Sequence, residues 1–128
     1  MDVKDNLTED FLEGIEDVKK LLLFIRFQPL LFDKKGLAYF VKFQREKTII
    51  EFLFGPSDWD IEMIIYIGNR KFAFKDLLEI FAIAKWVDDH RCKQAMGRNI
   101  KKELLWFVEL LKVSLPLIEC SEYQGNIY

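Results

Sequence analysis

The stretch YFVKFQREKTIIEFLF, from Tyr39 to Phe54, decides the fold. Two sets of residues alternate along it: Tyr39, Val41, Phe43, Ile50, Phe52 and Phe54 form the first, and Lys42, Gln44, Ile49, Glu51 and Leu53 form the second. Alternation with period two is typical of strands that bury one face. The pair Glu46-Lys47 interrupts the pattern and predicts a turn, so we expect an antiparallel hairpin.

The chain repeats this pattern after the hairpin. Residues 55–58, Gly-Pro-Ser-Asp, give a strong turn signal. A further alternating set follows: Ile61, Met63, Ile65 and Ile67 against Asp60, Glu62, Ile64 and Tyr66. A second turn at Gly68-Asn69 leads to a short strand from Arg70 to Phe74. We therefore expect an antiparallel meander of three to four strands with one buried and one mostly wet face.

Helical spacing flanks the meander on both sides. Near the N-terminus, after a cap at Asn6 or Thr8, apolar residues recur at spacings of three and four: Phe11, Ile15, Val18, Leu22 and Ile25. Toward the C-terminus a helical pattern covers residues 75–84. Asn99 can then cap a longer helix that Pro116 stops or kinks; its apolar stripe is Ile100, Leu104, Phe107, Val108 and Leu111.

Helices of this kind are expected to cover the apolar face of the sheet. The prediction is one α+β domain over residues 1–128, with residues 119–128 as a polar tail prone to fraying.

Composition and charge exclude several classes. Hydrophobic residues make up 51% of the 128 residues, and the formal net charge is -2. Disorder would need low hydrophobicity and high net charge. A sequence pI of about 5.5 also argues against a dedicated nucleic-acid binder.

No targeting or membrane segment is visible at the start or along the chain. The longest apolar stretches, such as Leu21–Ile25, are far shorter than the roughly 20 residues that cross a membrane. We expect a cytoplasmic protein with no membrane partner, in which Cys92 and Cys120 are free thiols.

The only histidine, His90, lies two residues before Cys92. A structural zinc site would need more ligands nearby, and Cys120 is distant along the chain. Residues two apart on a helix point to different sides, and no third orienting group is evident for a Cys–His nucleophile. The isolated glycines make no phosphate loop. We expect no catalytic residue, no metal and no cofactor.

A protein-binding surface is predicted where the third strand begins. The candidate contacts are Glu51, Asp58, Trp59, Asp60, Glu62 and Tyr66. An exposed tryptophan among carboxylates would suit a basic protein partner, since Trp anchors interfaces and charge steers encounter. The alternative is that Trp59 folds back onto the core and the acids are merely solvated.

The chain carries five largely apolar motifs, which are, in chain order, Ile50-Glu51-Phe52-Leu53-Phe54-Gly55-Pro56, Phe74-Lys75-Asp76-Leu77-Leu78, Ala84-Lys85-Trp86-Val87, Leu104-Leu105-Trp106-Phe107 and Ser114-Leu115-Pro116. Over residues 24–118 this order resembles small cytoplasmic immunity proteins of bacterial contact-dependent growth inhibition and related polymorphic toxin systems. The resemblance implies a stoichiometric inhibitor of the toxin domain, often a nuclease, of a cognate secreted effector. A basic nuclease cleft would fit acidic contact residues.

Three other functions stay open, in order of decreasing expectation. They are a non-enzymatic adaptor or regulatory subunit, a small enzyme that uses His90 with Cys92, and a nucleic-acid binder. The basic run from His90 to Lys102 lacks the interleaved aromatics that stack on bases. An effector gene immediately upstream would favour the immunity interpretation over an adaptor.

Charge reversal at Asp58, Asp60 and Glu62 is expected to weaken binding of the toxin domain, because these acids are predicted to face its basic surface. The measurement is the affinity of the triple variant for that domain. Unchanged affinity would exclude these residues as the contact surface.

Overall fold

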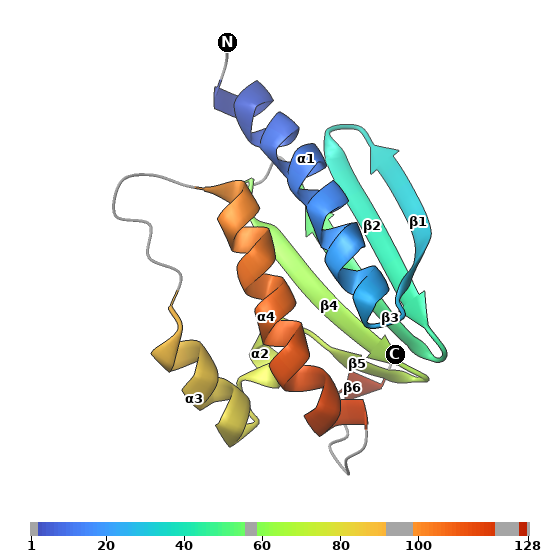
Figure 1. Cartoon of the computed structure of the whole chain (residues 1–128), viewed down its shortest axis with the longest axis vertical. Coiled ribbons are helices and arrows are strands. Elements are labelled where there is room, and N and C mark those ends of the chain that lie inside the picture. The colour runs from blue at the N-terminus through green and yellow to red at the C-terminus, as the bar shows by residue number, and fades with distance from the viewer. Residues whose placement is uncertain (1–2, 56–58, 92–98, 120–125, 128) are drawn as a thin grey trace.

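The computed structural model describes residues 3–55, 59–91, 99–119 and 126–127 (Figure 1). The elements in chain order are α1 (Val3–Phe24), β1 (Gln28–Lys35), β2 (Ala38–Arg45), β3 (Thr48–Phe54), β4 (Ile61–Ile67), β5 (Arg70–Phe72), α2 (Phe74–Leu77), α3 (Phe81–Asp89), α4 (Ile100–Glu119) and β6 (Asn126–Ile127). The α+β class and the order of helix, antiparallel meander and C-terminal helices are confirmed. Helix α1 begins at Val3, before the expected caps.

The strands form one antiparallel sheet in sequence order, β1 to β6. The four predicted strands are β2, β3, β4 and β5, although β5 ends at Phe72, and the turns at residues 46–47 and 68–69 are present. The sheet has two strands, β1 and β6, that were not predicted. Strand β1 was missed because nearly all of it is exposed, and a register shift between Pro29 and Leu31 breaks its alternation.

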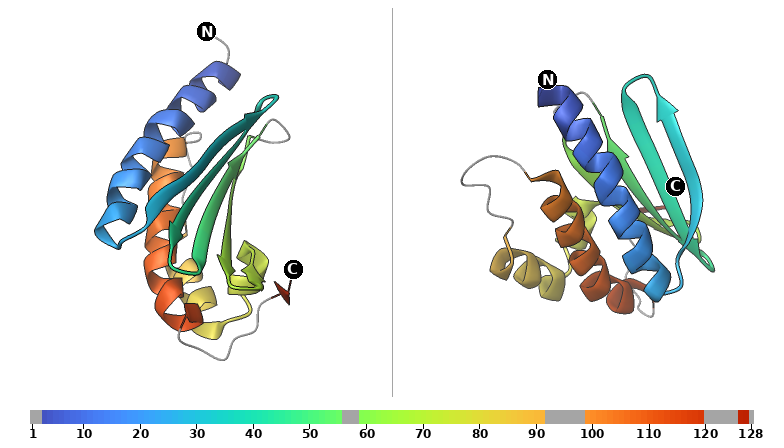
Figure 2. Two further views of the ribbon diagram at one scale, coloured as in Figure 1. Left: turned by 90° about the vertical axis from the view of Figure 1, so that its right-hand side faces the viewer. Right: turned by 45° about the horizontal axis from the view of Figure 1, so that its top comes forward.

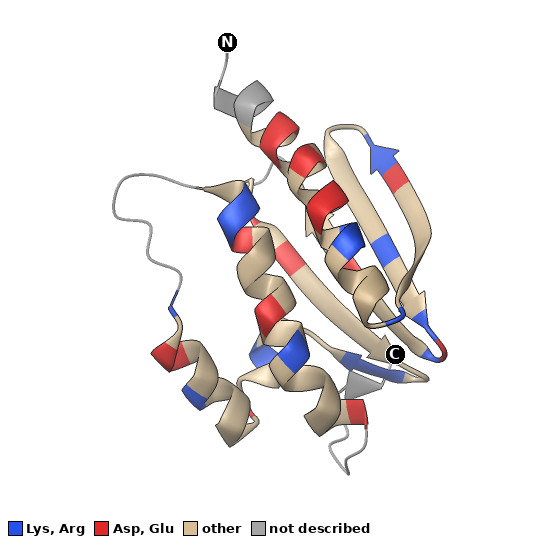
Figure 3. Ribbon diagram, in the orientation of Figure 1, with Lys and Arg blue, Asp and Glu red and all other residues tan. Residues whose placement is uncertain are grey.

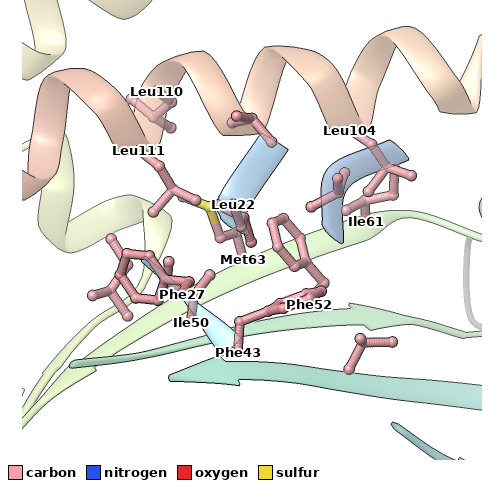
Figure 4. Close-up of a cluster of buried hydrophobic side chains, with 14 of the residues drawn as sticks. Leu22, Phe27, Phe43, Ile50, Phe52, Ile61, Met63, Leu104, Leu110 and Leu111 are labelled. Carbon is pink, nitrogen blue, oxygen red and sulfur yellow. The ribbon is translucent and has the colours of Figure 1, made fainter. Parts of the chain in front are cut away.

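The predicted alternation correctly separates the two faces of the sheet. The core face carries Tyr39, Val41, Phe43, Ile50, Phe52, Phe54, Ile61, Met63, Ile65 and Ile67, all of them buried. Figure 4 shows side chains of α4, including Leu104 and Leu111, directed at Phe52 and Met63. Helices α1 and α4 contact mainly each other; among the strands, α1 contacts β1 and α4 contacts β4. Both helices therefore lie on the same side of the sheet, as the left view of Figure 2 shows.

Helix α1 ends in a Schellman motif. The Phe27 N–H donates to the Leu22 carbonyl at 3.0 Å, and the Arg26 N–H donates to the Leu23 carbonyl at 3.0 Å. Arg26 takes the left-handed conformation, with φ of 70°, at the position where glycine is usual. Phe27 and Leu22 are both buried, which supplies the hydrophobic contact of this motif. The chain is thereby turned directly into β1.

Two further contacts fix helix α4. At its start, the Asn99 Oδ1 accepts the Lys102 N–H at 3.1 Å, which confirms the predicted cap. Pro116 lies within the helix and does not end it. At its end, the Glu119 carboxylate accepts a hydrogen bond from Thr48 Oγ1 at 2.6 Å and pairs with Arg45. Of the predicted tail, Glu119 is thus held to the sheet, and Asn126–Ile127 pair with β5.

Gly14 lies where α1 packs closely against α4, and the two helices lie side by side (Figure 1). A Cβ at this position would stand 2.6 Å from Leu104 Cδ1, and Leu104 is fully buried. The sequence alone marks this glycine only as a weak point of the helix. In the structure it permits the close approach of the two helices.

We predict that Gly14→Val lowers the free energy of unfolding by about 1–3 kcal/mol, because the added methyl groups overpack the helix contact. Lys20→Val is the matched control, since Lys20 is on the exposed side of the same helix and should cost only about 0.5 kcal/mol in helix propensity. Urea unfolding measures both. Equal effects of the two substitutions would contradict this role of Gly14.

Candidate protein-binding surface

The sheet face opposite α1 and α4 is the candidate surface, and we call it the open face. Its residues are defined by the strand register in three cross-strand rows: Asp33-Phe40-Leu53-Glu62, Leu31-Lys42-Glu51-Ile64 and Gln44-Ile49-Tyr66-Lys71. The main contacts of α2 are with β4 and β5, and those of α3 are with α4. The middle of the open face, on β2 and β3, is therefore left uncovered by the main packing of these helices.

The open face is less polar than a solvated sheet face. Phe40, Ile49, Leu53, Ile64 and Tyr66 are each half-buried by their neighbours and remain partly exposed to solvent. Cross-strand pairing brings Phe40 opposite Leu53, and Ile49 opposite Tyr66. The result is an apolar band across β2, β3 and β4 with charged side chains in the same rows.

Three of the six predicted contact residues, Glu51, Glu62 and Tyr66, gather on this face. Glu62 and Tyr66 are on β4 on either side of Ile64, which pairs with Glu51. Glu62 is exposed. Glu51 is only 6% exposed, accepts a hydrogen bond from the Tyr66 hydroxyl at 3.2 Å and pairs with Lys42 at 3.7 Å. Its carboxylate therefore acts within the face, whereas Glu62 projects from it.

Trp59 is not the exposed tryptophan among carboxylates that the sequence predicts. Its ring lies 5.4 Å from that of Phe54, and it packs half-buried against the core. Its backbone has φ of 53°, and its N–H donates to the Gly55 carbonyl at 3.0 Å. Trp59 is thus folded back, as the alternative expectation had it. Asp60 is exposed just before β4, and Asp58 lies outside the described residues.

The acidic character expected of the contact surface is concentrated elsewhere. The open face carries the acids Asp33, Glu51 and Glu62 and the bases Lys42 and Lys71, and Lys35 follows Asp33 two residues further along β1. Acidic residues instead gather along α1 (Figure 3): Glu9, Asp10, Glu13, Glu16 and Asp17. A hydrogen bond from Lys101 to Glu13, and the charge of Glu13, raise the pKa of Lys101 above its usual range. The open face is therefore mixed in charge, and the acidic surface belongs to the helical side.

The sequence did not reveal a second exposed apolar surface, which we call the β1 strip. Six of the ten large apolar side chains that are exposed in the described chain belong to it: Leu23, Phe24, Leu30, Leu31, Phe32 and Leu37. Phe24 is 87% exposed and Phe32 56%. Four of the six lie on β1 or in the turn that follows it, and exposed apolar patches mark interaction sites. Only the placement of β1 as an edge strand shows that its own residues, Leu30, Leu31 and Phe32, are uncovered.

His90 is placed by aromatic packing. Its ring stacks on Trp86 at 4.4 Å, its Nδ1 lies 2.8 Å from the Trp86 carbonyl, and its own carbonyl accepts the Trp106 indole N–H. Cys92 and Cys120, the thiols considered with it, lie outside the described residues. Over the ranges that the structure describes, no group of three or more His, Cys, Asp or Glu side chains could hold a metal ion.

The chain matches no protein-family model, no curated protein and no solved structure. Among the described helices, none is sufficiently long and apolar to cross a membrane.

We predict that Glu51→Ala lowers the free energy of unfolding by about 1 kcal/mol, because it removes the hydrogen bond with Tyr66 and the pairing with Lys42. Glu62→Ala, on the same face but exposed, should change it by no more than about 0.5 kcal/mol. Chemical denaturation of both variants provides the measurement. A larger effect at Glu62 than at Glu51 would overturn the assignment of Glu51 to the interior of the face.

Proposed function

We propose that this protein is a non-catalytic, stoichiometric inhibitor that binds a toxin domain, as an immunity protein does, through its open face. The resemblance in the order of its apolar motifs supports the choice of a toxin domain as partner. The supporting surface is the apolar band of the open face, together with the projecting Glu62.

The apolar band is the observation that carries the proposal. An antiparallel sheet with one solvated face usually alternates apolar inside with polar outside. Here Phe40, Leu53 and Ile64 occupy outward positions on three successive strands. Burying such a band against another protein removes apolar area from water, and the charged residues around it suit the polar rim of an interface.

The acidic residues support a basic partner through long-range attraction, and not through direct contact as the sequence predicts. The acids of α1 lie on the helical side, so they would not contact a protein docked on the open face. Their field still attracts a basic domain and raises the rate of encounter. The contact itself then depends on the apolar band and Glu62.

The β1 strip favours a second candidate function, that of an adaptor. It lies at the β1 edge of the sheet and shares only Leu31 with the open face, and Phe24 and Phe32 are exposed there. A protein with two docking surfaces could hold two partners together. An adaptor would bind a second protein through the β1 strip while the open face is occupied.

Co-expression with a toxin domain encoded beside this gene tests the proposal. The wild-type protein is expected to restore growth and to co-purify with the toxin in equal amounts. Leu53→Lys should weaken the complex at least about tenfold, which corresponds to about 1.4 kcal/mol. The matched control is Leu105→Lys on α4, where Leu105 is 41% exposed on the helical side, and it should bind like the wild type.

Two outcomes would contradict the proposal. If Leu53→Lys folds, as judged by circular dichroism, and still binds as tightly as the control, the open face is not the contact surface. If the wild type neither restores growth nor forms a complex, inhibition of that toxin is excluded.

A further inference from the structure

A cavity of about 290 Å³ lies between strand β4 and helix α2. It is lined by residues 61–64 of β4, by residues 73–75 and by Phe107 of α4. Strand β3 pairs with the whole of β4, but β5 pairs only with Ile65, Tyr66 and Ile67. Within the described residues, the first half of β4 therefore has no strand on the side away from β3. The cavity runs along this free half of the β4 edge.

The backbone of β4 is directed into the cavity at two residues. Hydrogen-bonding directions alternate along an antiparallel strand. The backbone N–H and C=O groups of Ile65 and Ile67 point toward β5, which follows β4 after a two-residue turn. By the alternation, the backbone groups of Ile61 and Met63 point to the same side. The N–H groups are positioned to donate, and the C=O groups to accept, the hydrogen bonds of one more strand.

The walls of the cavity are apolar and its rim is charged. Phe74 is 37% exposed, and its ring lies 6.5 Å from that of Phe107 and 6.2 Å from that of Trp106. On the rim, Glu62 and Lys75 are both exposed. An apolar side chain in the cavity would therefore lie among aromatic rings, with opposite charges at the rim.

We propose that this edge accepts an extended segment of a partner protein, which pairs with Ile61–Ile64 as an additional strand and places one apolar side chain in the cavity. The proposal deepens the proposed function and rests on it for the choice of a protein as partner. Glu62 and Ile64 belong to both the open face and the cavity, so one partner can cover both.

An extended peptide fits the site better than a small apolar molecule. Such a molecule would use the walls but leave the outward backbone groups of Ile61 and Met63 without partners, which is costly once water is displaced. Added strands bind through main-chain hydrogen bonds and gain specificity from side-chain pockets. The rim favours a segment with a basic residue near Glu62 and an acidic residue near Lys75.

The opposite edge of the sheet is less suited to strand addition. Strand β1 carries Pro29, a register shift at its start and two lysines at its end, Lys34 and Lys35. These features discourage edge pairing. The free half of β4 has no proline and no lysine.

The test uses a phage-displayed library of random heptapeptides selected on the immobilised full-length protein. Selected peptides should carry apolar residues at alternate positions, and they should bind Ala73→Leu at least about tenfold more weakly, because the larger side chain fills the cavity. Ala82→Leu, on an exposed position of α3, is the matched control and should bind like the wild type. Amide hydrogen exchange at Ile61 and Met63 in the wild type should slow at least about tenfold when a selected peptide is added.

The proposal is overturned if no peptide is enriched, or if the enriched peptides leave exchange at Ile61 and Met63 unchanged. The exchange measurement decides even where Ala73→Leu fails to fold. Because the peptides are independent of any toxin, peptide binding at this edge without toxin inhibition would contradict the proposed function alone. Toxin inhibition without strand addition would contradict only this inference.

Discussion

Gly14 packs against Leu104 where α1 and α4 contact each other, and both helices lie over the same face of the sheet. Close packing of two helices requires a small residue where their backbones approach, and Gly14 provides it. With both long helices on one side, the core face of every central strand is buried. The opposite face is left to its own cross-strand contacts. The open face is therefore a direct consequence of how the helices pack.

Period-two alternation predicted the central strands, their turns and the division of the sheet into two faces, because each of these strands buries one face. It could not predict β1, whose residues are nearly all exposed and whose alternation is broken by a register shift. The end of α1 was also hidden, since Arg26 occupies the left-handed position where glycine would have signalled the cap. Asn99, in contrast, is an ordinary capping residue, and its cap was predicted correctly.

The candidate site was predicted in part for the same reasons. Alternation places Glu51, Glu62 and Tyr66 on one face, but it says nothing of side-chain contacts. Only the structure shows that the Glu51 carboxylate accepts a hydrogen bond from Tyr66 and forms an ion pair with Lys42. Trp59 turns back to Phe54 through a left-handed backbone conformation that its sequence neighbours do not signal. The cavity beside β4 depends on the shortness of β5 and the position of α2, which are tertiary features.

The central claim is that the open face makes the contact with a toxin domain. Methyl NMR of the isotopically labelled protein, titrated with that domain, tests it most directly, since isoleucine and leucine methyl groups are present on both sides of the sheet. The account predicts changed signals for Ile49, Leu53 and Ile64 on the open face and unchanged signals for Leu105 on α4. Changes confined to Leu105, or to Leu30 and Leu37 of the β1 strip, would contradict it.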